Sequence, residues 1–354
     1  MEEIDVNPIW SDSMGAKSMC VKVETSDTSI VVDPAAAVMQ KSYPMKTERK
    51  YALLDKARGK IEKAARDAEH VFISHYHYDH HFLPGTSGID FSEVFSEKEL
   101  WIKDPNEWIN PSQWERSRKF LKGLLELHGV EKGLEDFEFE AEEKDYDDPL
   151  HELPMLQEID EGDYSERRGE LHEKWRNKFF DRTEMWSDEE HVEEPLDNVH
   201  FADGRTFVDG DTTVRFTEPL FHGIEYSKTG WVVSMVVEKG DEKFLYSSDL
   251  QGPTVEDYAE WIVKEDPEFL VLDGPATYLL GFMLNNFNLE RSNKNAERIA
   301  EGCDLGTMLY DHHLTRESGF REKSEGLWEL AENIEGEVLS YREYVEGKRP
   351  LVEG

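Results

Sequence analysis

The sequence predicts an α+β fold in which β-sheets are covered by helices. Eight short runs rich in β-branched and aromatic residues predict strands at residues 19–24, 29–33, 70–74, 213–218, 232–238, 243–248, 269–273 and 307–311. Several of these runs are continuously apolar and end in a polar residue, which is typical of strands buried on both faces. Strands and helices do not alternate strictly, so we expect sheets flanked by helices rather than a barrel.

Four segments between these strands predict helices. Residues 50–68 place apolar side chains at helical spacing. Asn110 followed by Pro111 predicts the cap and first turn of a helix that ends near residue 127. Two further helices are expected at residues 293–303 and 323–334.

The charge balance indicates the setting in which the protein works. Asp and Glu total 78 against 40 Lys and Arg, a formal net charge of −38, while 38% hydrophobic residues suffice for a sizeable core. The acids are spread along the chain, which excludes a single acidic tail. Such a surface suits a cytosol of molar salt, where the Debye length falls to about 3 Å. Because that salt screens long-range fields for every partner, the charge does not exclude a nucleic acid.

One segment differs in composition from the rest of a chain that we expect to form a single domain over residues 1–354. Between residues 131 and 200 there are 26 acidic residues against eight Lys and Arg. We interpret residues 131–198 as an acidic insertion, partly helical from Tyr164 to Phe180, with flexible acidic runs on either side. Its aromatic residues argue against a wholly solvated tract, but a surface excursion is favoured over a binding module.

Cysteine usage and the chain's beginning indicate a reduced, cytoplasmic protein. Cys20 and Cys303 lie far apart and form no CxxC pair, which excludes a thiolate zinc site and a disulfide framework. No basic segment followed by an apolar stretch opens the sequence, so no signal peptide is expected. The longest apolar run, at residues 231–237, is too short to cross a bilayer. No membrane association is expected, and the oligomeric state is not indicated.

A histidine-rich cluster carries the strongest chemical signal. It reads Ser-His75-Tyr-His77-Tyr-Asp79-His80-His81 directly after an apolar run. In extended chain, His75 and His77 project to the same side and can reach one metal ion. Asp79 and His80 follow as the chain turns and can reach a second ion nearby. Imidazole and carboxylate ligands together suit Zn²⁺ first, with Mn²⁺ and Fe²⁺ also open.

This cluster alone leaves two metal ions incompletely ligated, so further ligands must come from elsewhere. Three residues supply them in the same manner, each at the end of an apolar run: His222, Asp249 and His312. Groups on loops at strand ends are where binding and catalytic residues are commonly presented.

The ordered set His-x-His-x-Asp-His, then His, Asp and His, resembles the metallo-β-lactamase superfamily. More narrowly, the chain is similar to an archaeal family of metal-dependent hydrolases within it. The segments that carry this resemblance are Ser-His75-Tyr-His77-Tyr-Asp79-His80-His81, Tyr-Ser-Ser-Asp249-Leu-Gln-Gly-Pro, Gly274-Pro-Ala-Thr-Tyr278-Leu and Asp311-His312-His313-Leu. The resemblance covers most of the chain and fails over residues 131–198. It implies an αββα sandwich, in which two mixed β-sheets pack face to face and are flanked by helices.

The resemblance also implies a set of ligands for two divalent metal ions. The first ion would be held by His75, His77 and His222. The second would be held by Asp79, His80 and His312, and Asp249 would bridge the two. His312 is preferred to His313 because it follows the strand directly, and because Asp-His-His-Leu-Thr-Arg316 resembles the Thr-His-x-x-x-Arg form of related nucleases.

Four more residues are expected to support this site. Asp33 occupies the superfamily's early aspartate position and would orient a ligand, although an Asx turn before proline explains it nearly as well. His81 and His313 would contact ligands without binding metal. Tyr278 would line the substrate pocket, the alternative being a packed aromatic.

The predicted function is hydrolysis. Two divalent ions lower the pKa of a shared water, and the hydroxide formed would attack a phosphodiester, lactone or thioester. Asp79 and His80 are the expected catalytic residues, with Asp79 also orienting the nucleophile. The expected substrate is a small molecule or a nucleotide-type compound. The alternatives are a di-iron redox protein on the same fold, which typically has Glu where this chain has His77, and a non-catalytic metal-dependent binding or sensing protein.

Overall fold

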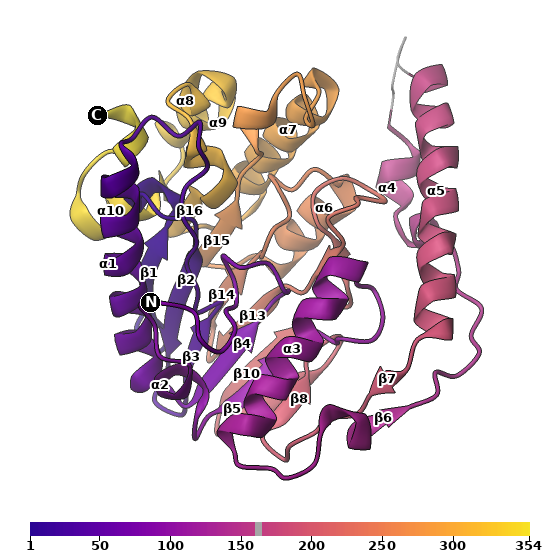
Figure 1. The fold of residues 1–354 in the computed structure, drawn as a ribbon. Helices are drawn as coiled ribbons and strands as arrows, with labels where there is room; N and C mark the ends of the chain where they lie inside the picture. The colour runs from indigo at the N-terminus through magenta and orange to yellow at the C-terminus, as the bar shows by residue number, and fades with distance from the viewer. Residues whose placement is uncertain (160–164) are drawn as a thin grey trace.

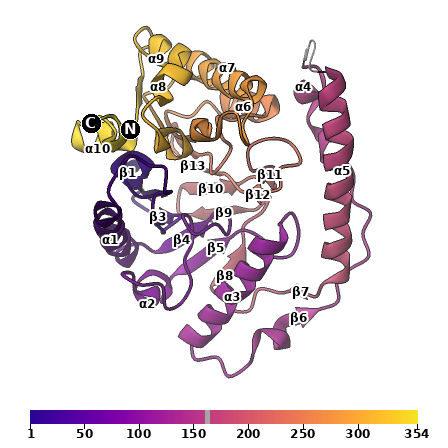
Figure 2. The same ribbon diagram turned by 45° about the horizontal axis from the view of Figure 1, so that its top comes forward.

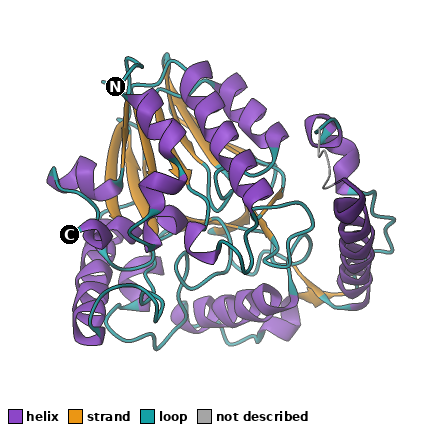
Figure 3. Ribbon diagram, turned by 90° about the horizontal axis from the view of Figure 1, so that it is seen from above, coloured by secondary structure: helices purple, strands orange, loops and turns teal. Residues whose placement is uncertain are grey.

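Two mixed β-sheets pack face to face, and helices cover both outer faces (Figure 1, Figure 3). The structure is a computed structural model that describes residues 1–159 and 165–354. The predicted α+β class and its four-layer αββα arrangement are confirmed. Strand order and direction then decide where the chemically interesting residues meet.

The first sheet has six strands in the order β1-β2-β3-β4-β5-β8. Their bounds are β1 Asp5–Ser11, β2 Met19–Glu24, β3 Ser29–Val32, β4 His70–Ile73, β5 Glu99–Ile102 and β8 Val199–Phe201. β1, β2 and β3 pair antiparallel, whereas β3, β4, β5 and β8 pair parallel. The carboxyl ends of the parallel strands therefore share one edge.

The second sheet has seven strands in the order β17-β16-β15-β14-β13-β10-β9. Their bounds are β9 Thr206–Asp209, β10 Thr212–Phe216, β13 Met235–Lys239, β14 Glu242–Tyr246, β15 Phe269–Asp273, β16 Thr307–Asp311 and β17 Glu337–Leu339. β14 to β17 pair parallel and the others antiparallel. Two small antiparallel pairs complete the strands, β11 Leu220–Phe221 with β12 Trp231–Val232, and β6 Glu138–Phe139 with β7 His191–Val192.

Helices lie outside each sheet. Those beside the first sheet are α1 Thr47–Arg66, α2 Phe91–Phe95 and α3 Pro111–Leu127. Those beside the second are α6 Glu256–Glu265, α7 Asn286–Gly302, α8 Phe320–Lys323 and α9 Glu325–Ala331, while α10 Tyr341–Glu346 contacts β1 and β16. α4 Pro154–Gln157 and α5 Ser165–Asp188 stand at one side of the sandwich (Figure 2). Among the described helices, none is both long and apolar enough to cross a membrane.

Short 3-10 helices connect several of these elements. Their bounds are η1 Asp12–Met14, η2 Leu134–Phe137, η3 Pro149–Glu152, η5 Thr277–Leu279, η6 His312–Arg316 and η7 Leu351–Glu353.

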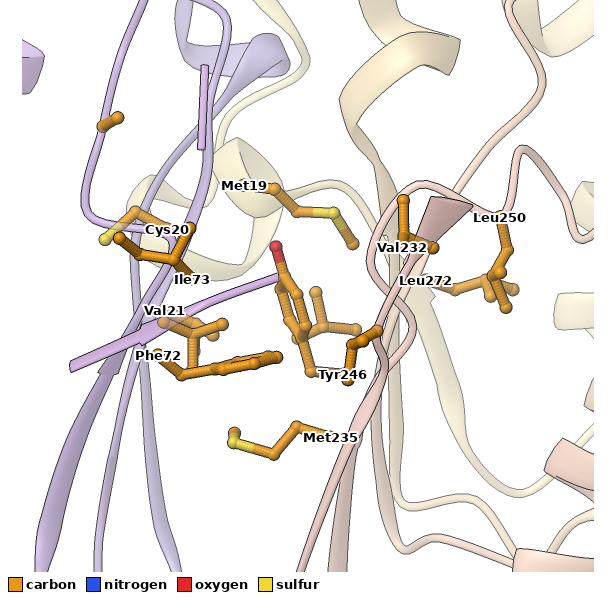
Figure 4. Packing of buried hydrophobic residues seen from close by; sticks show 14 of the residues in the cluster. Met19, Cys20, Val21, Phe72, Ile73, Val232, Met235, Tyr246, Leu250 and Leu272 are labelled. Atoms are coloured by element: carbon orange, nitrogen blue, oxygen red, sulfur yellow. The ribbon is translucent and has the colours of Figure 1, made fainter. Parts of the chain in front are cut away.

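The core between the sheets is built from the inward faces of their strands. Val21 and Phe72 of the first sheet lie opposite Met235 and Tyr246 of the second (Figure 4). All four are fully buried. Full burial of an apolar side chain of this size stabilises a fold by about 1.5–3 kcal/mol. Figure 4 also shows the Tyr246 ring standing between the sheets.

All eight predicted strands are present, but the run 232–238 is divided. β12 ends at Val232 and β13 begins at Met235. Between them, the Val233 amide donates to the Ser74 carbonyl and the Ser234 amide to the Thr217 hydroxyl. The chain thus passes from the small pair to the large sheet within one continuous apolar run, and the apolar pattern alone does not reveal this change of partner.

The predicted helices are found with shifted bounds. α3 starts at Pro111 as expected, and the Asn110 side chain caps it by accepting from the Gln113 amide. α7 begins at Asn286, earlier than the predicted 293, because the Asn285 side chain accepts from the Asn288 amide. The predicted helix 323–334 is two helices, α8 and α9, separated at Ser324.

The acidic segment is more firmly packed than the favoured surface excursion implies. The predicted helix at 164–180 corresponds to α5, which extends to Asp188, and Tyr164 lies outside the described residues. Phe179 and Trp186 of α5 are fully buried, and the Trp186 ring lies 5.4 Å from that of Trp231 in β12. α5 therefore packs an apolar face on the sandwich. The flexible acidic runs beside it remain a prediction.

Candidate metal centre

The candidate centre lies where strands of both sheets end. Asp33 follows β3 and His75 comes shortly after β4, at the carboxyl edge of the first sheet. Asp249 comes after β14 and His312 directly after β16, at the carboxyl edge of the second. Crevices outside the carboxyl ends of parallel strands are common places for ligand sites. The layered fold thus gathers residues more than 200 positions apart in the chain.

Unusual backbone conformations are concentrated at these strand ends. Four non-glycine residues there have positive φ: Asp33 at 46°, Ser248 and Gln251 at 55°, and His312 at 53°. Such angles cost energy for residues with a Cβ and persist only where the surroundings enforce them. Here the Asp33 amide donates to the Phe72 carbonyl over 2.8 Å. Strain of this kind clusters at functional sites.

Three histidines and Asp249 converge on one point. His75, His77 and His222, which we call the His77 group, offer ligand atoms that lie with one from Asp249 within 4.8 Å of one another. His75 Nε2 is 3.0 Å from His77 Nδ1. Asp249 Oδ2 lies 3.0 Å from His222 Nε2 and 3.4 Å from His75 Nε2.

A second set of donors lies on the other side of Asp249. Asp79, His80 and His312, the His80 group, also bring ligand atoms within 4.8 Å of one another. Asp249 Oδ1 lies 3.2 Å from His80 Nε2 and 3.5 Å from His312 Nε2. One carboxylate oxygen thus faces each group. All seven predicted ligands are brought together, in the two groups that the resemblance implied.

Several of these donor atoms have no hydrogen-bond partner within the described parts of the chain. His80 Nε2, His222 Nε2 and Asp249 Oδ1 are buried and make no hydrogen bond, although His80 Nε2 and His222 Nε2 each lie within 3.2 Å of an Asp249 oxygen. Buried polar atoms are almost always paired, because leaving them unpaired is costly. Imidazole nitrogens and carboxylate oxygens are the donors that Zn²⁺, Mn²⁺ and Fe²⁺ bind. The donor set therefore fits two divalent cations, one at each group.

Asp33 holds His80 in place. Its carboxylate accepts from His80 Nδ1 at 2.7 Å, from the Ser74 amide and hydroxyl at 2.8 and 2.6 Å, and from the Tyr246 hydroxyl at 2.6 Å. With Nδ1 so engaged, His80 directs Nε2 at Asp249. Burial alone would lower the pKa of His80, but the carboxylates of Asp249 and Asp33 outweigh it and raise that pKa to about 10.

The His77 group contains imidazoles that resist protonation. Burial, and then repulsion from His80, lowers the pKa of His75 to about 4. Burial and the neighbouring His75 and His222 hold the pKa of His77 well below its usual value. Neutral imidazole is the form that ligates a metal ion, so at neutral pH these two side chains need not release a proton to bind one.

Asp12 and Arg316 form a buried pair beside the His80 group. The Arg316 guanidinium donates to the Asp12 carboxylate, and its Nη2 also lies 3.2 Å from Asp79 Oδ2. Asp12 Oδ1 is 3.3 Å from His312 Nδ1, which also donates to the Ser18 carbonyl at 3.0 Å. Sequence reasoning missed Asp12 and noted Arg316 only as part of a resemblance. Asp12 directly follows β1, so recognising that strand would have revealed it.

His312 and His313 have different contacts, which decides between them as candidate ligands of the second ion. His313 Nδ1 donates to the carboxylate of Asp273, 2.9 Å from Oδ1, and its Nε2 lies 4.0 Å from Asp249 Oδ2. It forms a set with Asp249 and His312 but does not join Asp79 and His80. The geometry therefore favours His312 for the second ion. Asp273 was missed, although it ends an apolar strand as the other candidates do.

His81 lies apart from the donor atoms of the centre. Its Nδ1 donates to the His77 carbonyl at 3.0 Å, and its ring stacks on Tyr78 with 5.6 Å between centroids. It belongs to none of the ligand sets in the described residues. It therefore contacts the ligand residue His77 through that residue's backbone and supports the turn that carries it, without offering an atom to either ligand group.

A cavity of about 520 Å³ opens beside the centre. His77, His222 and His313 are among the residues that line it. Tyr278 lines it too, and its hydroxyl accepts from Arg316 Nη1 at 3.2 Å; that it contacts a substrate there remains a prediction. The volume is within the range of small-molecule sites, about 300–1,000 Å³.

The fold and the site together define a metallo-β-lactamase-like αββα protein with a site able to bind metal ions. No family model matches the chain. The UPF0282 protein of Methanopyrus kandleri is 30% identical over 348 residues, which cover 96% of this chain and 94% of that protein. The UPF0282 protein of Methanocaldococcus jannaschii is 30% identical over 325 residues, covering 90% and 87%. The chain belongs to the UPF0282 family.

A solved structure resembles the chain at low sequence identity. The metallo-beta-lactamase fold protein YhfI from Bacillus subtilis is 14% identical with a TM-score of 0.40, covering 95% of this chain and 94% of that chain. The fold assignment rests on the two facing sheets and on the strand-end positions of the donor residues, not on that score.

Proposed function

We propose that this protein is a metal-dependent hydrolase with seven ligands for two divalent cations, Zn²⁺ being the first choice and Mn²⁺ or Fe²⁺ the others. When bound, such ions would polarise the scissile group and lower the pKa of a water molecule so that it can attack near neutral pH. The observation that supports this best is Asp249, which turns one oxygen to the His77 group and the other to the His80 group.

The chain's own residues would position the reaction. Asp79 is half-buried, lines the cavity, and is held by Arg316 Nη2 at 3.2 Å. Its second oxygen is then available to accept a proton from an attacking water and to orient it. His80 is fixed by the hydrogen bond from its Nδ1 to Asp33. Prealigned groups of this kind lower the barrier because they need no reorganisation during reaction.

Replacement of His77 should remove metal and activity together. His77→Ala leaves the His77 group with two imidazoles, so we expect elemental analysis to show the loss of about one ion per chain. Hydrolysis of bis-p-nitrophenyl phosphate should fall by about 10²-fold or more. His128→Ala is the matched control, because His128 is exposed at the end of α3 and should change neither quantity. Two ions retained in His77→Ala would refute the ligand assignment.

We also propose that the protein works in a cytosol of molar salt. At a net charge of −38, self-repulsion destabilises the compact state in dilute buffer, and salt screens it. Secondary structure followed by circular dichroism should be lost on dialysis from 2–3 M KCl to about 0.05 M, and metal content should fall with it. A fully folded, metal-loaded protein in dilute buffer would contradict this proposal.

A further inference from the structure

The cavity beside the centre is basic, in a chain that is strongly acidic. Of the described residues that line it, one is acidic, Asp79. Five are basic: Lys17, Lys178, Arg182, Lys228 and Arg316. In the whole chain, acids outnumber Lys and Arg by 78 to 40. Residues drawn at random from this chain would give the cavity a net negative charge. Its net positive charge therefore indicates a site for a negatively charged ligand.

Four of these cations have no ion-pair partner among the residues that the structure describes. Arg316 is engaged by Asp12 and Asp79. Lys17, Lys178, Arg182 and Lys228 form no salt bridge with a described carboxylate. Elsewhere lysines are commonly paired, as Lys103 is with Asp203 and Lys239 with Asp27.

The outer cations are held in place by the fold. Arg182 Nη1 in α5 donates to the Ser227 carbonyl at 3.0 Å. On the other side, Asn110 Nδ2 at the start of α3 donates to the carbonyls of Lys228 and Thr229 at 3.2 and 2.7 Å. The loop after His222 is therefore clamped between two helices. Its Lys228 and the Lys178 of α5 are exposed side chains at the same cavity.

The remainder of the cavity is apolar. The half-buried ring of Trp175 lines it from α5, and Leu279, Met283 and Leu284 line it from the segment after β15. Planar rings stack favourably on an indole face, and apolar side chains exclude water from such a contact. A ligand that fills the cavity therefore combines negative charge with a planar apolar part.

We propose that the substrate is a small phosphate ester carrying a planar apolar group, with Lys178, Arg182 and Lys228 attracting the negative charge of its phosphate. This inference rests on the hydrolase function proposed above and narrows it. The acidic segment then has a role, because its helix α5 supplies Trp175, Lys178 and Arg182 as the outer wall of the cavity. Short contacts of this kind persist at high salt, where only longer-range attraction is screened away.

The test reverses the charge at the cavity mouth. In the metal-loaded protein, the double variant Lys178→Glu/Lys228→Glu should raise KM for bis-p-nitrophenyl phosphate at least about tenfold with little change in kcat, because two attractive contacts become repulsive. Lys174→Glu is the control: it makes one such Lys→Glu change one helical turn from Lys178, at an exposed residue that does not line the cavity. It should leave KM unchanged.

Binding of adenosine 5′-monophosphate, measured by calorimetry, gives a readout that does not depend on turnover. We expect the double variant to weaken this binding at least about tenfold and Lys174→Glu to leave it unchanged. If a neutral lactone or thioester is the better substrate and charge reversal alters neither KM nor nucleotide binding, the inference is overturned while a hydrolase remains. If nothing is hydrolysed, the proposed function fails, and the binding result alone decides whether the cavity takes a phosphate ester.

Discussion

Asp249→Asn should abolish both metal binding and hydrolysis. The variant keeps the size of the side chain but removes the charge that faces four histidines, His75, His80, His222 and His312. On the proposed assignment both ions would lose a ligand at once, so we expect fewer than one ion per chain by elemental analysis. Hydrolysis should fall by roughly 10³-fold or more.

The control for this prediction makes the same chemical change at the surface. Asp241 is exposed in the turn between β13 and β14, and Asn is well tolerated in turns. Asp241→Asn should retain two ions and full activity. An Asp249→Asn protein that still binds two ions would show that the carboxylate does not bridge them.

Glu225→Gln should produce the largest loss of stability. The Glu225 carboxylate is buried and accepts from Arg168 Nη2 and His172 Nε2, each at 2.8 Å, and from Arg291 Nη1 at 3.2 Å. It thereby joins α5 to α7 and to the loop after His222. Removing one partner of a buried pair costs about 3–5 kcal/mol. We expect thermal unfolding to occur roughly 10 °C lower, whereas Glu173→Gln, an exposed change on α5, should have little effect.

The difference in unfolding temperature between wild type and Glu225→Gln should depend on pH in a known direction. Burial opposes ionisation of Glu225, but Arg291, His172 and Arg168 outweigh it and hold its pKa far below the usual 4.5. A depressed pKa contributes stability above the unfolded value, and this contribution is lost as pH falls. The gap in unfolding temperature between wild type and Glu225→Gln should therefore be constant above about pH 5 and narrow progressively below it. A gap that is unchanged at pH 3 would mean that the charge is not responsible.

Local patterns in the sequence predict most of the strands and place the candidate ligands just after apolar runs, while the αββα arrangement and the assignment of seven ligands to two ions came from the resemblance. A strand and the polar residues that follow it are recognised together. β1 was missed because Pro8 interrupts its pattern, and β17 because it has only three residues. α6 was missed because the residue before it, Val255, provides no side-chain cap.

Residues that support the ligands could not be found in the same way. Asp12 and Arg316 lie 304 positions apart, and nothing local in either segment indicates the other. The position of α5 could not be predicted from the sequence either, because its many charged residues favoured a helix on the surface. Only the three-dimensional structure shows that Phe179 and Trp186 are buried and that Lys178 and Arg182 line the cavity.

The proposed two-ion centre is tested most directly by anomalous X-ray scattering from crystals of the protein loaded with Zn²⁺. Data collected on either side of the zinc absorption edge locate each ion without reference to activity. We expect two peaks, one at His75, His77 and His222 and the other at Asp79, His80 and His312, with Asp249 in contact with both. A single peak, or two peaks that Asp249 does not join, would contradict the account.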